Sequence, residues 1–151
     1  MAEASPARLY ATLVGGVLVV AGIAGFFYSS SFGTPGAVDE LLGTFAVNGW
    51  LNVLHFLTGA LGLLVAGFAP RRYAFWLGIA YLGIAGWGFT LGEGESVLGL
   101  FPVDTAGNIL HLALGALGVA AALGTPKGGD TPKDGSRRPA PEKPLNAAVR
   151  A

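Results

Sequence analysis

Four long apolar segments separated by short polar stretches make up most of the chain. The first, 9–28, contains no charged residue, and a run of about 20 such residues is long enough to span a bilayer. Three more follow at roughly 47–68, 73–92 and 106–124. The pattern predicts an all-α membrane domain over 1–124 with four transmembrane helices.

The second and fourth apolar segments carry the same sequence of polar interruptions. At an offset of 56 residues, GTFAVNGWLNVLHFLTGALGL (43–63) matches GLFPVDTAGNILHLALGALGV (99–119) without a gap. We therefore expect two tandem copies of one helical hairpin, repeat one at 8–68 and repeat two at 72–124. Because each copy begins and ends on the same side of the membrane, the copies form a parallel repeat related by a pseudo-twofold axis along the membrane normal.

The first apolar segment is expected to remain in the mature protein. It is longer than the ~7–15 residues of a typical signal-peptide core. Its AGIAGF (21–26) also resembles LGIAGW (82–87) in the third segment, and a removable leader has no reason to be repeated.

The polar residues of each copy fall on one face of the predicted helix. Five positions advance by 4, 3, 4 and 3 residues, a spacing that keeps them on one side. The two stripes are Asn48, Asn52, His55, Gly59 and Gly62, and Asp104, Asn108, His111, Gly115 and Gly118. Polar side chains facing lipid are costly, so both stripes are expected to face the interior of a four-helix bundle. The glycines would let the helices approach closely, and the asparagines and the aspartate would line a polar vestibule that opens to the outside.

Composition supports the membrane class and narrows the chemistry. Charged residues make up 12% of the 151 residues, against about 25% in soluble domains. The net charge is zero, which gives no reason to expect a nucleic acid partner. The chain contains no cysteine, which excludes disulfides, thiolate catalysis and iron–sulfur ligation by its own residues.

The charges of the loops predict the orientation. Arg71 and Arg72 lie between the second and third segments, whereas the loops after the first and third segments carry only acidic residues. Because basic residues stay on the cytoplasmic side, we expect a multi-pass protein of the cell membrane with both termini in the cytoplasm. The proline-rich, mixed-charge segment 125–151 is expected to be a disordered cytoplasmic tail.

Two motifs resemble a known family. The patterns F-x-V-N…N-x-x-H…G and V-D-T-A-x-N-x-x-H-x-x-x-G are similar to those of an uncharacterised bacterial membrane protein family, domain of unknown function 4383. The resemblance covers residues 8–124 and implies a four-helix membrane domain with two histidine-bearing segments. It implies no activity.

The two histidines, His55 and His111, leave three roles open. In the interpretation we favour, each imidazole bonds the asparagine one turn earlier or a neighbouring helix. The chain is then a non-enzymatic structural or interaction subunit that associates with lipid and other membrane proteins. In the second, the histidines bind the iron of haem b between diagonal helices for electron transfer. In the third, they line an outward-facing pocket that binds a small ligand or senses pH, since imidazole changes charge in the physiological range.

Other chemistries have little support in the sequence. Zinc in proteins normally takes three or four protein ligands, and each copy supplies one imidazole, so no metal site is expected. There is no Ser-His-Asp spacing and no pair of carboxylates within the apolar segments. We therefore expect no catalytic residues.

Overall fold

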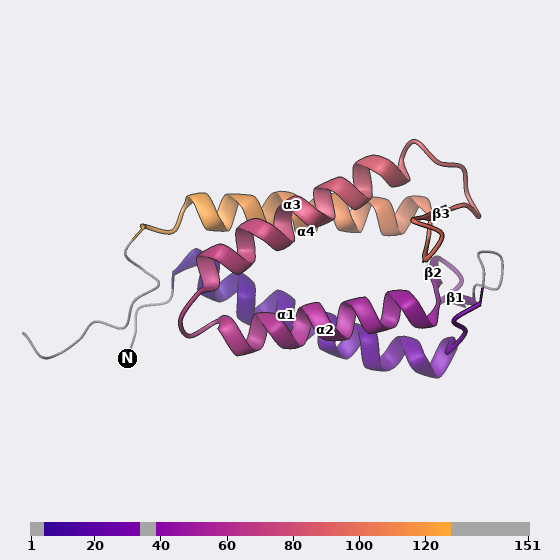
Figure 1. The fold of residues 1–151 in the computed structure, drawn as a ribbon, viewed down its shortest axis with the longest axis horizontal. Coiled ribbons are helices and arrows are strands. Elements are labelled where there is room, and N and C mark those ends of the chain that lie inside the picture. Colours follow the sequence, from indigo (N-terminus) through magenta and orange to yellow (C-terminus); the bar gives the residue numbers. More distant parts are fainter. Residues whose placement is uncertain (1–4, 34–38, 128–151) are drawn as a thin grey trace, which may run out of the picture.

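The computed structural model describes residues 5–33 and 39–127 of the chain (Figure 1). It is mostly helical, and its four helices begin and end within a few residues of the predicted bounds. They are α1 (Pro6–Tyr28), α2 (Gly49–Val65), α3 (Pro70–Gly88) and α4 (Thr105–Leu123). Residues 128–151, which make up most of the predicted tail, lie outside the described residues.

The helices form two antiparallel pairs, α1 with α2 and α3 with α4 (Figure 1). Within each pair, glycine brings the two backbones into contact. A Cβ atom on Gly59 would lie 2.6 Å from the carbonyl oxygen of Gly15, and one on Gly115 would lie 2.9 Å from that of Gly78. Only a residue without a side chain fits at such a distance, so both crossings require glycine.

Two short β-hairpins add to the predicted all-α fold. β1 (Asp39–Leu41) pairs with β2 (Phe45–Val47), and β3 (Ser96–Val97) pairs with β4 (Phe101–Pro102), both antiparallel. Each turn contains a Leu-Gly pair in which both residues have positive φ, 55° and 64° in the first and 57° and 68° in the second. The sequence analysis treated both segments as loops. The repeated Leu-Gly followed by F-x-V was the signal that could have identified them.

The residues that cap α2 and α4 join the two halves of the molecule, α1–α2 and α3–α4, at the end that carries the β-hairpins. Asn48 caps α2 and Asp104 caps α4, each by accepting a hydrogen bond from a backbone N–H of the first turn. The amide of Asn48 also donates to the carbonyl oxygen of Leu100 at 2.7 Å, and Asp104 Oδ2 accepts from the backbone N–H of Ala46 at 3.0 Å. Each cap is therefore also a bond to the opposite half.

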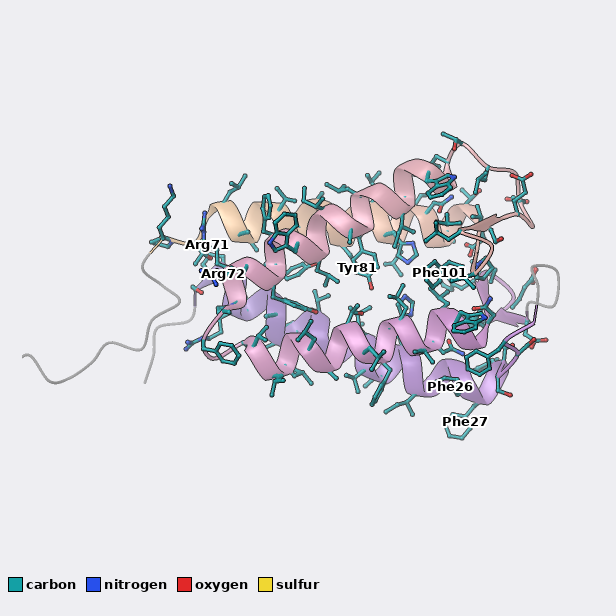
Figure 2. The ribbon with its side chains drawn as sticks, viewed as in Figure 1. Phe26, Phe27, Arg71, Arg72, Tyr81 and Phe101 are labelled. Atoms are coloured by element: carbon teal, nitrogen blue, oxygen red, sulfur yellow. The ribbon has the colours of Figure 1, made fainter. Side chains whose placement is uncertain are left out.

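Arginines bind the helix ends at the opposite pole of the molecule. Arg8 Nε donates to the carbonyl oxygen of Ala66 at 3.1 Å, and Arg71 Nε donates to that of Ala122 at 3.0 Å. A cation at a helix C-terminus binds free carbonyls and is favoured by the helix dipole. Figure 2 shows Arg71 and Arg72 at this pole, away from the hairpins.

The matching contacts of the two pairs correct one part of the predicted repeat. The donors Arg8 and Arg71 are 63 residues apart, whereas their acceptors Ala66 and Ala122 are 56 apart. The resemblance of 21–26 to 82–87 corresponds to an offset of 61, two residues less than the offset of 63 between Arg8 and Arg71. That resemblance rests on identical residue types, whereas the contacts depend on the faces through which the helices pack.

Two of the helices within the described residues, α1 and α4, are long and apolar enough to cross a membrane. The helix α2 is apolar but has 17 residues. The helix α3 has 19 residues, and these include two arginines, two tyrosines, two tryptophans and four glycines, which lower its mean hydropathy.

Candidate functional site: a cavity between the helical pairs

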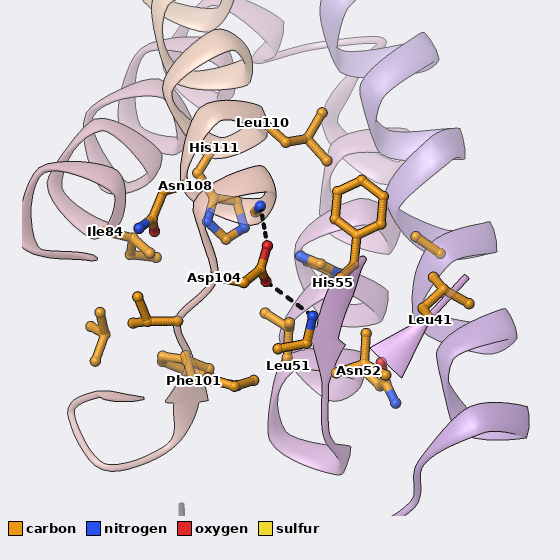
Figure 3. A pocket seen from close by; sticks show the side chains of 18 residues that line it. Leu41, Leu51, Asn52, His55, Ile84, Phe101, Asp104, Asn108, Leu110 and His111 are labelled. Atoms are coloured by element: carbon orange, nitrogen blue, oxygen red, sulfur yellow. Dashed lines mark hydrogen bonds between the residues drawn. The ribbon is translucent and has the colours of Figure 1, made fainter. Parts of the chain in front are cut away.

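A cavity of about 160 Å³ lies between the two helical pairs, directly under the hairpins (Figure 3). Residues of α2 and α4 form its two walls. The hairpins cover its end through Leu41, Phe45, Val97 and Phe101. The hairpins therefore cover part of the region that was expected to be an open vestibule.

The predicted site residues divide into three groups. Asn52, His55, Asp104, Asn108 and His111 line the cavity, and the other lining residues are apolar. Asn48 is not a lining residue, because its side chain is bound to Leu100. The glycines of the two stripes lie further from the hairpins and pack against the neighbouring helices; these are Gly59, Gly62, Gly115 and Gly118.

The asparagine of the first stripe bonds the backbone and not the histidine. Asn52 is almost fully buried, at 1% exposure, and its Nδ2 donates to the carbonyl oxygen of Ser29 at 2.8 Å. Its amide occupies the space that a side chain at Gly25 would fill. The expected Asn–His hydrogen bonds are not among those of the described residues. The Asn52 side chain points toward α1, which takes it away from His55.

The two histidines face each other across the cavity from opposite pairs. Their ring centroids are 6.1 Å apart with an interplanar angle of 67°. His111 also stacks on Tyr81, with centroids 5.0 Å apart and an angle of 13°. Within the described part of the chain, three buried polar atoms here have no hydrogen-bond partner: His55 Nε2, His111 Nδ1 and the Tyr81 hydroxyl oxygen.

The cavity does not fit haem. Pockets for larger organic ligands measure about 300–1,000 Å³, and this cavity has about 160 Å³. The charged residues of the described chain near the hairpins are carboxylates, which repel the propionates of haem; they are Asp39, Glu40, Glu93, Glu95 and Asp104. The described residues also contain no group of three or more His, Cys, Asp or Glu side chains placed to hold a metal ion.

Tyrosines form a second set of interior polar contacts, which the sequence analysis missed. The hydroxyl of Tyr10 donates to the carbonyl oxygen of Leu114 at 2.9 Å, and that of Tyr73 donates to the carbonyl oxygen of Thr58 at 3.0 Å. Each tyrosine thus bonds the opposite pair. The motif R-x-Y-A, at residues 8–11 and 71–74, was the available signal.

Among the comparisons with known proteins, the match to a family model assigns the chain to a family. A search of curated proteins and a search of solved structures each found no match. The family model described as "Domain of unknown function (DUF4383)" matches residues 8–124. This match confirms the resemblance inferred from the two histidine motifs, and the chain belongs to that family.

Proposed function

We propose that the chain is a four-span integral protein of the cell membrane that acts as a non-enzymatic structural or interaction subunit. One observation carries the proposal: the helices bury small and polar residues and expose large apolar ones. Soluble proteins do the opposite, and they rarely expose apolar patches larger than a few hundred Å².

The buried faces of all four helices consist mainly of glycine, alanine, tyrosine, asparagine and histidine. Leu18, Leu51 and Leu77 are the large aliphatic residues among the buried helical positions of the described chain. Each helix meanwhile exposes large apolar side chains. Examples are Val20 and Phe27 on α1, Leu57 and Leu64 on α2, Trp76 and Ile79 on α3, and Ile109 and Leu117 on α4. Lipid is the solvent that suits such a surface.

The same argument supports membrane spans for α2 and α3. At 1.5 Å per residue, the 17 residues of α2 cover about 26 Å of a hydrocarbon core about 30 Å thick. Its hairpin supplies further apolar residues at one end. In α3, Trp76 and Trp87 are exposed, and exposed tryptophans are typical of membrane interfaces. The bundle thus has four spans in two tandem hairpins that run in parallel.

Charge supports the orientation. In the described part of the chain the basic residues are Arg8, Arg71, Arg72 and Lys127, all in the first helical turns or connections at one pole. The carboxylates belong to the hairpin pole. The rule that positive residues stay inside therefore gives cytoplasmic termini and extracellular hairpins.

The subunit role is supported by how the interior polar groups are used. Asn48, Asn52, Tyr10 and Tyr73 all bond backbone groups of a neighbouring element. These bonds fix the helices relative to one another and offer no reactive group. The apolar outer surface leaves all four helices free to pack against other membrane proteins.

Reporter fusions test the spans and the orientation. A reporter active only in the cytoplasm is expected to work after Arg150 and to fail when inserted at Gly94 in the loop after α3. The reverse pattern would overturn the orientation, and activity at both sites would overturn the four-span arrangement. The subunit role is tested by purification from native membranes in mild detergent. A stoichiometric membrane protein partner is expected, and a chain that purifies alone at every detergent concentration contradicts this role.

An absorbance spectrum tests the competing electron-transfer function. Protein expressed with ample haem and purified in detergent is expected to show no Soret band with or without dithionite, because the cavity does not fit the macrocycle. A Soret band that disappears in both His55→Ala and His111→Ala would replace the subunit role by electron transfer.

A further inference from the structure

We propose that the cavity between His55 and His111 is a binding site for a small lipophilic molecule of the phenol class, one six-membered ring with a hydroxyl group. The inference rests on the proposed membrane location, because the lipid would supply a lipophilic ligand. It adds a binding site that the subunit role does not require.

The size and lining of the cavity set the apolar part of the ligand. An apolar cavity of about 150 Å³ in another protein takes up benzene. This one has about 160 Å³ and is partly open. Its walls are apolar apart from five residues, and its end is covered by Leu41, Val97 and Phe101. A single hydrocarbon ring matches both the volume and the walls.

The unpartnered imidazole nitrogens determine which polar group the ligand must carry. Buried polar groups without a hydrogen bond are rare in proteins and are destabilising. His55 Nε2 and His111 Nδ1 are both buried without a partner among the described residues, and both residues line the cavity. A ligand that supplies hydrogen bonds here removes that penalty.

A hydroxyl group fits the two imidazoles better than a carbonyl does, because a carbonyl oxygen only accepts. A neutral imidazole has one nitrogen that donates and one that accepts, and a hydroxyl both donates and accepts. Two hydrogen bonds of about 2.8 Å let one oxygen bridge nitrogens up to about 5.6 Å apart. The ring centroids lie 6.1 Å apart in an edge-to-face arrangement, so the two imidazoles are close enough for one small polar group to contact both.

The other polar side chains of the cavity have neighbours of their own, and Asn108 packs its amide against Gly88 of α3. Asn52 donates to Ser29, and Asp104 accepts from Ala46 and caps α4. His111 is held in place by its stacking on Tyr81. The site therefore has fixed walls and two fixed hydrogen-bonding groups.

The test uses 4-methylphenol and toluene, which have similar size and differ in the hydroxyl group. The chain has two histidines, so full-length protein labelled with ¹⁵N-histidine in micelles gives one set of imidazole signals for each. We expect 4-methylphenol to shift the signals of both histidines saturably and to bind at least tenfold more tightly than toluene. His111→Phe keeps a ring of similar size and removes the nitrogen, so it should weaken 4-methylphenol binding at least tenfold and leave toluene binding unchanged.

Two further variants separate binding from effects of the micelle. Ala21→Leu places a larger side chain at the cavity wall and should abolish the shifts, whereas Leu117→Phe changes an exposed residue of α4 and should preserve them. Circular dichroism checks that each variant is helical. Equal responses to both compounds, or imidazole signals that stay constant while the protein is folded, would overturn the proposal and leave a cavity that is merely hydrated. Neither outcome bears on the reporter fusions, so failure of the site and failure of the membrane arrangement are distinguishable.

Discussion

Tyr10 and Tyr73 lie with their ring centroids 6.5 Å apart where α1 meets α3. Tyr10 of α1 donates a hydrogen bond to α4, and Tyr73 of α3 donates one to α2, so each hydroxyl bonds the opposite helical pair. Gly118 and Gly62 make room for these hydroxyl groups, since a Cβ atom at either glycine would contact the tyrosine of the opposite half. The glycines of the two polar stripes thus admit the tyrosines that hold the halves together.

Removing either hydroxyl is expected to weaken the contact between the pairs. Interhelical hydrogen bonds in membranes contribute about 0.6 kcal/mol on average, so Tyr10→Phe and Tyr73→Phe should each lower the free energy of unfolding by about that amount. Reversible unfolding in mixed micelles measures it. Tyr28→Phe at the exposed end of α1 is the matched control and should have no effect. A loss as large in the control as in the other two variants contradicts the role of these bonds.

The glycine contact between α1 and α2 makes a sharper prediction. In Gly59→Ala the new Cβ atom would lie 2.6 Å from the carbonyl oxygen of Gly15 and 2.6 Å from the backbone nitrogen of Val19. Backbone atoms move little, so the helices must separate, and overpacking of this kind destabilises by about 1–3 kcal/mol. Gly16→Ala adds the same atom on α1, the other helix of this crossing, at a position where nothing lies within 4 Å. The same unfolding assay should therefore separate Gly59→Ala from Gly16→Ala, and equal stabilities would refute the close approach.

Arg8 and Arg72 carry the same charge at the same pole but differ in their contacts. Arg8 donates to the carbonyl oxygens of Ala66 and Gly67 beyond the end of α2, whereas Arg72 is exposed. A cation at a helix C-terminus is worth about 0.3–1 kcal/mol. Arg8→Gln should lower the thermal midpoint in detergent, and Arg72→Gln should leave it nearly unchanged. If the two variants lose equal stability, net charge at this pole matters more than the bonds of Arg8.

The sequence was sufficient to predict the helices, because each is a continuous apolar run bounded by recognisable signals. The caps Asn48 and Asp104 precede α2 and α4, and Pro6 and Pro70 begin α1 and α3. The hairpins were missed because strands of two or three residues carry too little periodicity to detect. Their turns also place Leu42 and Leu98 at positive φ, where glycine or asparagine is the usual residue.

The spacing of the polar residues brings several of them to one cavity, but it does not give their bonding. Helical spacing placed Asn52 and His55 on one face, and both line the cavity. That spacing does not specify which neighbour each side chain meets. Asn52 bonds Ser29 because Gly25 leaves room for its amide, a contact between residues of two helices that no periodicity within α2 reveals. The same limit explains why the tyrosine contacts were missed.

Asp104 gives the prediction that separates helix capping from charge. Its Oδ1 accepts from the N–H of Gly107 at 2.6 Å, and its Oδ2 accepts from that of Ala46 at 3.0 Å. Loss of a cap alone destabilises by about 0.5–2 kcal/mol, and Asp104→Ala also leaves the N–H of Ala46 without this acceptor. We expect Asp104→Ala to lower the free energy of unfolding by about 2 kcal/mol, near the upper end of that range.

Asp104→Asn should have a stability between those of the wild type and Asp104→Ala. Asparagine caps helices about as well as aspartate does, and Asn48 fills the equivalent position of α2, but the Nδ2 of asparagine donates and cannot accept from the N–H of Ala46. The ranking of the three proteins by unfolding in micelles is the measurement. If Asp104→Asn is as unstable as Asp104→Ala, the bond to Ala46 and the negative charge of Asp104 stabilise the start of α4 more than the cap does.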